Sequence, residues 1–448
     1  MASTYLTRTT GSPTNSKKFT VSGWFKIFDT TENQFLQHYT DGSNREHMYF
    51  ASGTFRWYCN DGGTTRVFVK PNMQFTDMAA FYHIVIACDT TQNTVSDRVK
   101  IYVNGSQITS FDTATYPPQN FDFLINSNNK LLAMGRYMGI DDYYYDGIIS
   151  HFHFIDGTQY DATAFGETDT TTGEWKIKSA PSVTYGNNGY FILRDGNSVT
   201  DQSGNSNNFT VAGGTLTKTE DCPDNVFATM NPLDNHYANG TFTNGNNTVT
   251  SLNTGYTYNT STIGVNSGKF YWECKWSAQP TGSSNQVHIG IAKRIVPSAT
   301  TWLGQQLYTY AYQASSGHVF HNNVEASGSS ATTYAVGDII SLALDLDNNK
   351  IHFAKNGTWT NSSNPSANSG GVTITAPDST SGDSGFYFAA FGDSNVSLQE
   401  TGQFNFGNGF FGTSAVADNS TATASTPGTF NYDVPAGYQP LTTKGLNA

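Results

Sequence analysis

Three aspartates and three tyrosines stand together in one short segment, and this combination could bind either a sugar or a metal ion. The residues are Asp141, Asp142, Tyr143, Tyr144, Tyr145 and Asp146. Tyrosine rings stack on the C–H face of a sugar, while carboxylates accept hydrogen bonds from its hydroxyl groups. Loop carboxylates also suit calcium, for which Asp141, Asp142 and Asp146 are the candidate ligands. Two alternatives stay open: acidic loops are often simply solvated, and alternate tyrosines can pack inward as core.

A second aromatic group lies in the other half of the chain and supplies further candidates for glycan binding. Its members are Trp302, Tyr308, Tyr310 and Tyr312. The stretch is rich in loop-forming residues, which favours an exposed binding surface. The alternation of the three tyrosines equally predicts a half-buried strand whose rings face a core.

The residue patterns do not indicate catalysis. The nearest carboxylate group is Glu167, Asp169 and Glu174, which lacks the short spacing of a glycosidase pair and has threonine and glycine as neighbours. His151 and His153 alternate along a predicted strand as solvent-facing residues, and a metal pair there would lack an identifiable third ligand. We therefore expect a protein that is not an enzyme and requires no cofactor, with calcium as the one ion to consider.

Composition narrows the classes of partner. Only 13% of the residues are charged, 14% are aromatic, and the net charge is −12 with scattered basic residues, so nucleic acid is a poor candidate. There is no signal peptide and no run of 18 apolar residues, so we expect a product made in the cytosol that does not insert into membranes. The four widely spaced cysteines, Cys59, Cys88, Cys222 and Cys274, are predicted to be free thiols.

The elements that must position these residues are strands. Apolar residues alternate with a period of two in many short runs, and the clearest are 19–25, 83–88, 99–103, 148–155, 270–276, 287–291, 339–344, 350–354 and 386–391. The dipeptide Asn104-Gly105 directly follows the run 99–103, and Asn356-Gly357 follows residues 350–355; both predict strand-ending turns. Because helical patterns do not separate the strands, the sequence predicts an all-β protein built from antiparallel β-sandwiches of the jelly-roll type.

A chain of 448 residues is too long for one hydrophobic core, and its polar stretches suggest where it divides. A segment of low hydrophobicity runs from about residue 201 to 232. We predict a first sandwich over 1–215, a linker over 216–235 and a second sandwich over 236–411. Residues 412–448 have the composition of an extended C-terminal tail or docking peptide.

Two family resemblances support this division. The first half resembles laminin G-like domains of the concanavalin A type in four segments: FTVSGWF at 19–25, FYHIVI at 81–86, RVKIYVNG at 98–105 and YDGIISHFHFIDG at 145–157. The second half resembles a SPRY domain, most specifically in VGDIISLALDLDNNKIHFAKNG at 336–357. The order of the modules, with DNVFATMNPLD at 224–234 between them and PAGYQPL at 435–441 near the end, resembles tailed-bacteriophage virion proteins.

The resemblance implies a function that the residues alone do not establish. It implies a viral protein of the virion, such as a tail fibre or surface adhesin, that attaches to host cell-surface glycan and contacts other virion proteins. A homo-oligomer is expected, with a trimer the usual fibre arrangement. It also implies calcium at the loops of the first domain and ligand binding at loops of the second. The alternatives are a capsid or tail decoration protein that docks only to virion proteins, and a polysaccharide depolymerase.

Overall fold

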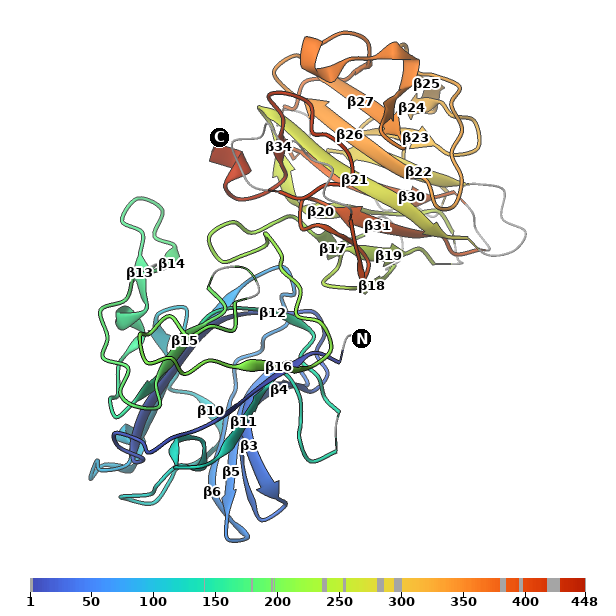
Figure 1. Ribbon diagram of the computed structural model, residues 1–448. Helices are drawn as coiled ribbons and strands as arrows, with labels where there is room; N and C mark the ends of the chain where they lie inside the picture. Colours follow the sequence, from blue (N-terminus) through green and yellow to red (C-terminus); the bar gives the residue numbers. More distant parts are fainter. Residues whose placement is uncertain are drawn as a thin grey trace. The chain divides into compact units, whose positions relative to one another are not determined.

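The computed structural model is almost entirely β-structure and forms two compact units (Figure 1). It describes residues 3–447 except 141, 179, 195, 197, 236–239, 253–254, 280–285, 294–299, 379–383, 395–397 and 417–427. The first unit comprises Met1–Lys218 and Cys222–Asp224, and the second comprises Thr219–Asp221 and Asn225–Ala448. The predicted fold class, two tandem antiparallel β-sandwiches, is confirmed.

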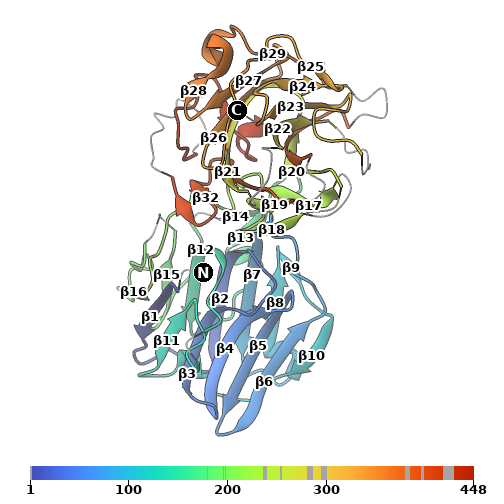
Figure 2. The same cartoon turned by 90° about the vertical axis from the view of Figure 1, so that its right-hand side faces the viewer.

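The first unit is a sandwich of two sheets (Figure 2). The larger sheet contains β1 (Tyr5–Thr9), β3 (Asn33–Asp41), β4 (Asn44–Ala51), β5 (Thr54–Asp61), β6 (Thr64–Pro71), β10 (Phe111–Thr115), β11 (Leu131–Met134) and β16 (Thr210–Gly213), in the order β10-β6-β5-β4-β3-β11-β1-β16. The smaller sheet contains β2 (Lys18–Ile27), β7 (Tyr82–Asp89), β8 (Val99–Val103), β9 (Ser106–Gln107), β12 (Gly147–Asp156) and β15 (Tyr190–Ile192), in the order β15-β12-β2-β7-β8-β9. A hairpin of β13 (Gly166–Thr168) and β14 (Trp175–Ile177) and the short 3-10 helices η1 (Val95–Asp97), η2 (Leu124–Asn126) and η3 (Ala162–Ala164) complete the unit.

The smaller sheet is covered on both faces, which explains why its strands are nearly continuously buried. On one face, Phe19 packs edge-on against Trp57 of the opposite sheet, with ring centroids 5.8 Å apart. On the other face, Trp24 stacks on His83 at 4.7 Å, and the β13-β14 hairpin lays Trp175 over the same histidine at 6.0 Å.

The prediction that His151 and His153 both face solvent from one side of a strand is wrong. The register of β12 against β2 shifts between Ser150 and His153, and His151 adopts a positive φ of 47°. His153 stays on the side of the sheet opposite the core residues Phe152 and Phe154, but this side is covered: Nδ1 lies 2.8 Å from the Tyr185 hydroxyl and the ring stacks on Phe191 at 3.9 Å.

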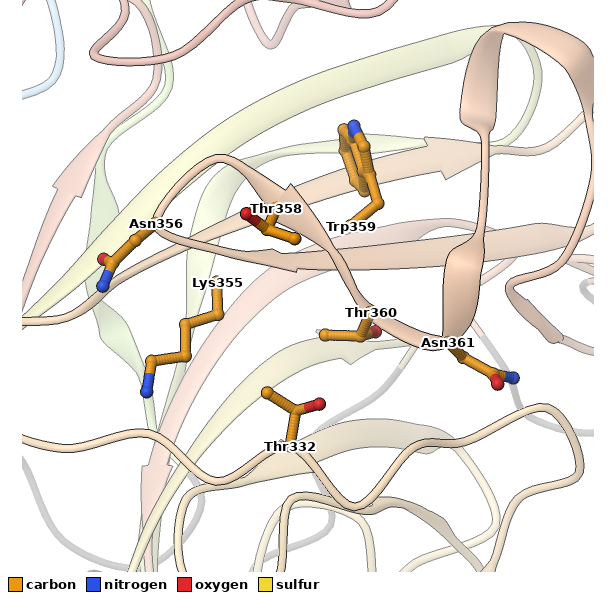
Figure 3. Close-up of a pocket in the computed structure, with 7 residues that line it drawn as sticks. All are labelled: Thr332, Lys355, Asn356, Thr358, Trp359, Thr360 and Asn361. Atoms are coloured by element: carbon orange, nitrogen blue, oxygen red, sulfur yellow. The ribbon is translucent and has the colours of Figure 1, made fainter.

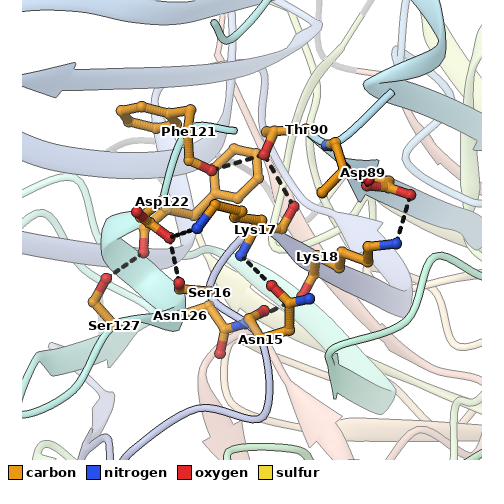
Figure 4. A network of polar contacts seen from close by, with 12 residues as sticks. Asn15, Ser16, Lys17, Lys18, Asp89, Thr90, Phe121, Asp122, Asn126 and Ser127 are labelled. Carbon is orange, nitrogen blue, oxygen red and sulfur yellow. Dashed lines mark hydrogen bonds and ion pairs between the residues drawn. The ribbon is translucent and has the colours of Figure 1, made fainter. Parts of the chain in front are cut away.

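Polar contacts fix the loops at one end of the first sandwich (Figure 4). Lys17 Nζ lies 3.1 Å from Asp122, and Lys18 Nζ lies 3.0 Å from Asp89. The Thr90 hydroxyl donates to the carbonyl of Phe121 at 2.8 Å. These contacts join the start of β2, the end of β7 and the segment before η2.

The second unit is also a sandwich of two sheets. One contains β17 (Met230–Asn235), β20 (Thr257–Val265), β22 (Val287–Ala292), β23 (Thr309–Gln313), β24 (Val319–His321), β25 (Val324–Glu325) and β30 (Tyr387–Asp393), in the order β17-β20-β30-β22-β23-β24-β25. The other has the path β18 (Thr241–Thr243), β19 (Thr248–Thr250), β31 (Thr401–Asn405), β21 (Lys269–Ala278), β26 (Ile339–Asp345), β27 (Lys350–Lys355) and β28 (Thr358–Trp359), with β29 (Val372–Thr373) on β27 and β34 (Gln439–Pro440) on β21. The pair β32 (Phe410–Phe411) and β33 (Ser414–Ala415) and the 3-10 helices η4 (Thr360–Ser362), η5 (Pro365–Ala367) and η6 (Gly445–Asn447) complete it.

The described end of the predicted tail is a packed layer of the second unit rather than a separate arm. We call residues 428–441 the C-terminal strap. Phe430, Val434 and Tyr438 of the strap are buried with Tyr271 and Ala343, on the side of β21 and β26 that faces away from the main core. The apolar residues recur every four positions, so one side of the extended segment meets the sheet.

Two further sequence predictions concern the whole chain. All four cysteines are free, and three of them are buried, as predicted. Across the part of the chain that the structure describes, no helix is long and apolar enough to cross a membrane.

Candidate functional site

Aromatic side chains cover the outer face of the eight-stranded sheet in the first unit, the side turned away from its core. Strand pairing places Gln37, His47, Tyr58 and Phe68 directly opposite one another across β3, β4, β5 and β6. Tyr39 of β3 and Tyr49 of β4 lie on the same side. Two tyrosines from the loop after β11 join them. We call the full set the aromatic face: Tyr39, His47, Tyr49, Tyr58, Phe68, Tyr137 and Tyr143.

The rings of the aromatic face are in mutual contact. His47 stacks in parallel on Tyr49 at 4.7 Å and meets Tyr58 edge-on at 5.4 Å. Tyr137 lies 5.5 Å from His47 and 6.2 Å from Tyr143. Tyr143 is the most open of them, at 39% exposed. The rings therefore form a connected platform across four strands and one loop.

Local sequence explains why the rings face outward. In β4, the alternating residues Arg45, His47 and Tyr49 point away from the core, whereas Glu46 and Met48 point into it. The buried Glu46 carboxylate accepts hydrogen bonds from Trp57 Nε1 and from the Ile125 backbone N–H, both at 3.1 Å. Burial raises the pKa of Glu46 to about 7 despite these bonds.

Two polar side chains, those of Arg45 and His47, lie among the rings of the aromatic face and have defined hydrogen-bonding roles. Arg45 donates from Nη1 to the Tyr137 hydroxyl at 2.7 Å, and its guanidinium lies over the Tyr58 ring at 5.2 Å. In the described part of the chain no carboxylate lies within ion-pair distance of Arg45, whose side chain is instead hydrogen-bonded to Tyr58 and Tyr137.

The protonation of His47 is fixed by its neighbours. Burial, together with the charge of Arg45, lowers its pKa to about 3, so the ring is neutral. Gln34 Nε2 donates to Glu32 at 2.6 Å, which leaves the Gln34 oxygen to accept from His47 Nδ1 at 3.3 Å. Nδ1 therefore carries the proton, and Nε2 is an acceptor. The face thus offers aromatic rings, a cationic donor and a neutral acceptor.

The tyrosines predicted from the sequence divide between this face and the core. Only Tyr143 joins the aromatic face, with a positive φ of 54°. Tyr144 lies next to Tyr5, with ring centroids 6.4 Å apart. Tyr145 packs against Phe25 and donates its hydroxyl to the carbonyl of Lys26 at 3.2 Å, and burial raises its pKa well above the usual value. Tyr145 is therefore a packing residue, as the alternative of inward-facing tyrosines anticipated.

The predicted calcium ligands are only partly described. Asp141 lies outside the described residues, and Asp142 is exposed. Asp146 is half-buried, and burial together with the nearby Asp29 carboxylate raises its pKa. Within the described ranges no three His, Cys, Asp or Glu side chains converge as a metal site. The structure therefore adds no support for calcium.

The aromatic candidates of the second unit are mostly buried. Tyr310 and Tyr312 are 3% and 1% exposed and belong to the main core, so their prediction as glycan-binding residues is wrong. The half-buried strand proposed as the alternative explains their alternation, because β23 carries both rings on its inner face. Trp302 is half-buried, stacked on His288 at 4.5 Å and edge-on to Phe320 at 5.4 Å. Tyr308 is half-buried just before β23.

Two small hollows, which the sequence did not predict, flank the β27-β28 hairpin of the second unit. One, of about 330 Å³, is lined by Thr332, Lys355, Asn356, Thr358, Trp359, Thr360 and Asn361. Figure 3 shows the Trp359 side chain pointing away from Thr332 and Lys355. The other hollow, of about 260 Å³, lies where Trp359 meets the C-terminal strap.

The arrangements that most resemble catalytic sites have structural roles. Lys176 lies 3.7 Å from Glu167 and 3.1 Å from Asp169, so these carboxylates are paired on an exposed hairpin. His83 Nε2 lies 2.9 Å from the Ser22 hydroxyl, as a general base would. However, Trp175 Nε1 donates to His83 Nδ1 at 3.0 Å, which places the ring proton on Nε2. His83 therefore donates to Ser22 and cannot take its proton.

Comparisons with known proteins identify the two units. Residues 1–163 match the concanavalin A-like lectin/glucanases superfamily, specifically its laminin G-type family, and residues 269–409 match the SPRY domain family. The predicted tandem of a laminin G-like and a SPRY domain is confirmed. No curated protein sequence matches the chain.

Similar solved structures are distant from this chain in sequence. The SPRY domain of human HERC1 is 19% identical and aligns over 39% of this chain and 96% of its own, with a TM-score of 0.31. A heptameric SAP-like pentraxin from Limulus polyphemus is 16% identical over 35% of this chain and 71% of its own, with a TM-score of 0.26. A human SPRY domain is 15% identical and aligns over 35% of this chain and 90% of its own, with a TM-score of 0.25.

Proposed function

Because the chain joins a concanavalin A-like domain to a SPRY domain, we propose that it is a non-enzymatic adhesin of a bacteriophage virion that binds host cell-surface glycan. The aromatic face is the proposed binding surface. The observation that carries this proposal is the connected platform of seven rings with Arg45 as a donor and His47 as an acceptor. Rings of this kind stack on the apolar face of a sugar, and the polar atoms match its hydroxyl groups.

The assembly of the particle is part of the same proposal. The resemblance in module order to tailed-phage proteins supports a virion location, for example in a tail fibre. A homo-oligomer, with a trimer as the expected form, would offset weak single-site affinity by presenting several faces at once. Light scattering of the purified chain tests the oligomer, and the position and copy number of the chain in a map of the intact particle test the location.

The binding claim is tested by incubating the purified full chain with a glycan array that includes bacterial surface polysaccharides. We expect saturable binding that Tyr58→Ala and Tyr143→Ala each weaken at least tenfold. The matched control is Phe386→Ala in the second unit, which removes a ring of similar exposure, 41% against 39% for Tyr143. Absence of binding to every glycan and to host cells would favour a decoration protein that contacts only other virion proteins.

Catalysis is tested on the same polysaccharides. We expect no release of reducing sugar ends. Release that Glu167→Gln abolishes would instead establish a depolymerase and contradict the proposal.

A further inference from the structure

The second hollow arises from the order of side-chain sizes along one row of the sheet. Strand pairing places Glu273, Ser341, Ala354 and Trp359 directly opposite one another across β21, β26, β27 and β28. All four lie on the outer side of this sheet, the side that the C-terminal strap covers. The two middle side chains are small and the two end ones are large. A depression over Ser341 and Ala354 follows directly.

The C-terminal strap deepens this depression into a pocket that is partly open to solvent. Its Tyr432 and Asp433 line one side, and Tyr271 and Gly357 line the remainder. Gly357 has a positive φ of 79° and lets the Tyr432 ring pack directly against the backbone of the β27-β28 turn. A Cβ atom at this position would lie only 2.7 Å from that ring. The pocket therefore exists only while the strap is docked.

A single buried carboxylate holds the strap at this point. Glu273 accepts hydrogen bonds from the backbone N–H groups of Asn431 and Tyr432, each at 2.9 Å. It also accepts from the Tyr271 hydroxyl at 3.0 Å and from Asn405 Nδ2 at 3.1 Å. Both carboxylate oxygens are thus saturated by donors, so Glu273 positions Tyr432 and is not itself available to a ligand.

Polar and aromatic groups line the pocket in a complementary way. The Ser341 side chain is 1% exposed, and its hydroxyl lies within hydrogen-bonding reach of the Tyr271 hydroxyl, which also lines the pocket. Trp359 and Tyr432 provide rings at the walls, and the Asp433 carboxylate lies at the rim.

We propose that the pocket between Trp359 and the C-terminal strap is a second saccharide site, specific for a single neutral sugar ring and formed only when the strap is docked. The volume of about 260 Å³ suits one ring rather than an extended chain. The rings contact its C–H face, while Ser341 and Asp433 bond its hydroxyl groups. This site lies in the other unit from the aromatic face and does not depend on the function proposed for that face.

The test uses the full chain and four probes: the methyl glycosides of glucose, mannose and galactose, and N-acetylglucosamine. Binding is measured by saturation-transfer NMR with titration. We expect at least one probe to bind saturably, with affinity at least tenfold weaker in Trp359→Ala and in Tyr432→Ala. Tyr58→Ala on the aromatic face is the control and should leave this binding unchanged.

The possible outcomes separate the two sites. If none of the four sugars binds, or if binding persists in both Trp359→Ala and Tyr432→Ala, the second site does not exist. If Tyr58→Ala alone abolishes binding, the sugar occupies the aromatic face, which supports the proposed function and overturns this inference. If Trp359→Ala fails to fold, the sugar affinities of Tyr432→Ala and Ser341→Ala test the second site instead, because neither substitution changes the main core.

Discussion

Replacing Glu273 with glutamine should loosen the C-terminal strap while leaving the rest of the second sandwich folded. The carboxylate accepts four hydrogen bonds, two at each oxygen. A glutamine side chain offers one oxygen and one NH₂ group, so two of the four donors would face another donor. Each buried donor left without a partner costs about 1–3 kcal/mol, so docking should weaken by about 2–6 kcal/mol.

Hydrogen exchange followed by mass spectrometry measures this change directly. A loss of about 2 kcal/mol corresponds to roughly a 30-fold increase in exchange. We therefore expect backbone amides of residues 428–441 to exchange at least 30-fold faster in Glu273→Gln than in the unsubstituted chain at pH 9, where the Glu273 carboxyl, with its pKa of about 7, is ionised. Amides of β26 should stay protected, because that strand lies in the core sheet whichever state the strap adopts.

The matched control is Glu46→Gln, which alters a buried glutamate of the first unit. Burial raises the pKa of both Glu46 and Glu273 to about 7, so the two variants make equivalent chemical changes. Exchange in the strap should not respond to Glu46→Gln. Unchanged exchange of the strap in Glu273→Gln would refute the assignment of Glu273 as its anchor.

Three further predictions test other parts of the account. Burial lowers the pKa of His47 and His83 to about 3 and raises that of Glu46 to about 7. Between pH 6.5 and 4.5, unfolding lets the two histidines take up protons and lets Glu46 release one. The net uptake averages about one proton, so the free energy of unfolding of the first unit should fall by about 1 kcal/mol per pH unit as the pH is lowered, seen as a falling Tm in calorimetry. A flat or rising Tm would contradict this sign. Tyr310→Phe removes the hydroxyl that accepts from the Thr375 N–H at 3.0 Å, and should cost about 1 kcal/mol in urea unfolding without changing glycan affinity. Arg45→Ala should weaken glycan binding at least tenfold with little change in Tm, whereas unaltered affinity would remove Arg45 from the site.

The sequence predicted the strands well because burial imposes a simple alternation on them. The runs 19–25, 148–155 and 339–344 all lie within strands of the structure. Alternation gives no sign of a bulge, however. The register shift in β12 depends on its pairing with β2, and the burial of His153 depends on the covering residues Tyr185 and Phe191, so neither could be predicted from neighbouring residues alone.

The aromatic face could be predicted only in part, because it is assembled from distant segments. The alternation of Arg45, His47 and Tyr49 is visible in the sequence and marks one strand with an unusual outer face. Which strands lie beside it, and that Tyr137 bonds Arg45 across 92 positions, is decided by the sheet order. The docking of the C-terminal strap could not be predicted from the sequence either, because Glu273, which holds it, lies 158 positions before Asn431.

The most direct test of the central claim is a crystal structure of the full chain with the strongest glycan found on the array. The account predicts a sugar ring stacked on the aromatic face, in van der Waals contact with Tyr58, Tyr137 or Tyr143 and hydrogen-bonded to Arg45 or His47 Nε2. A glycan bound elsewhere on the first unit, with the aromatic face empty, would contradict it.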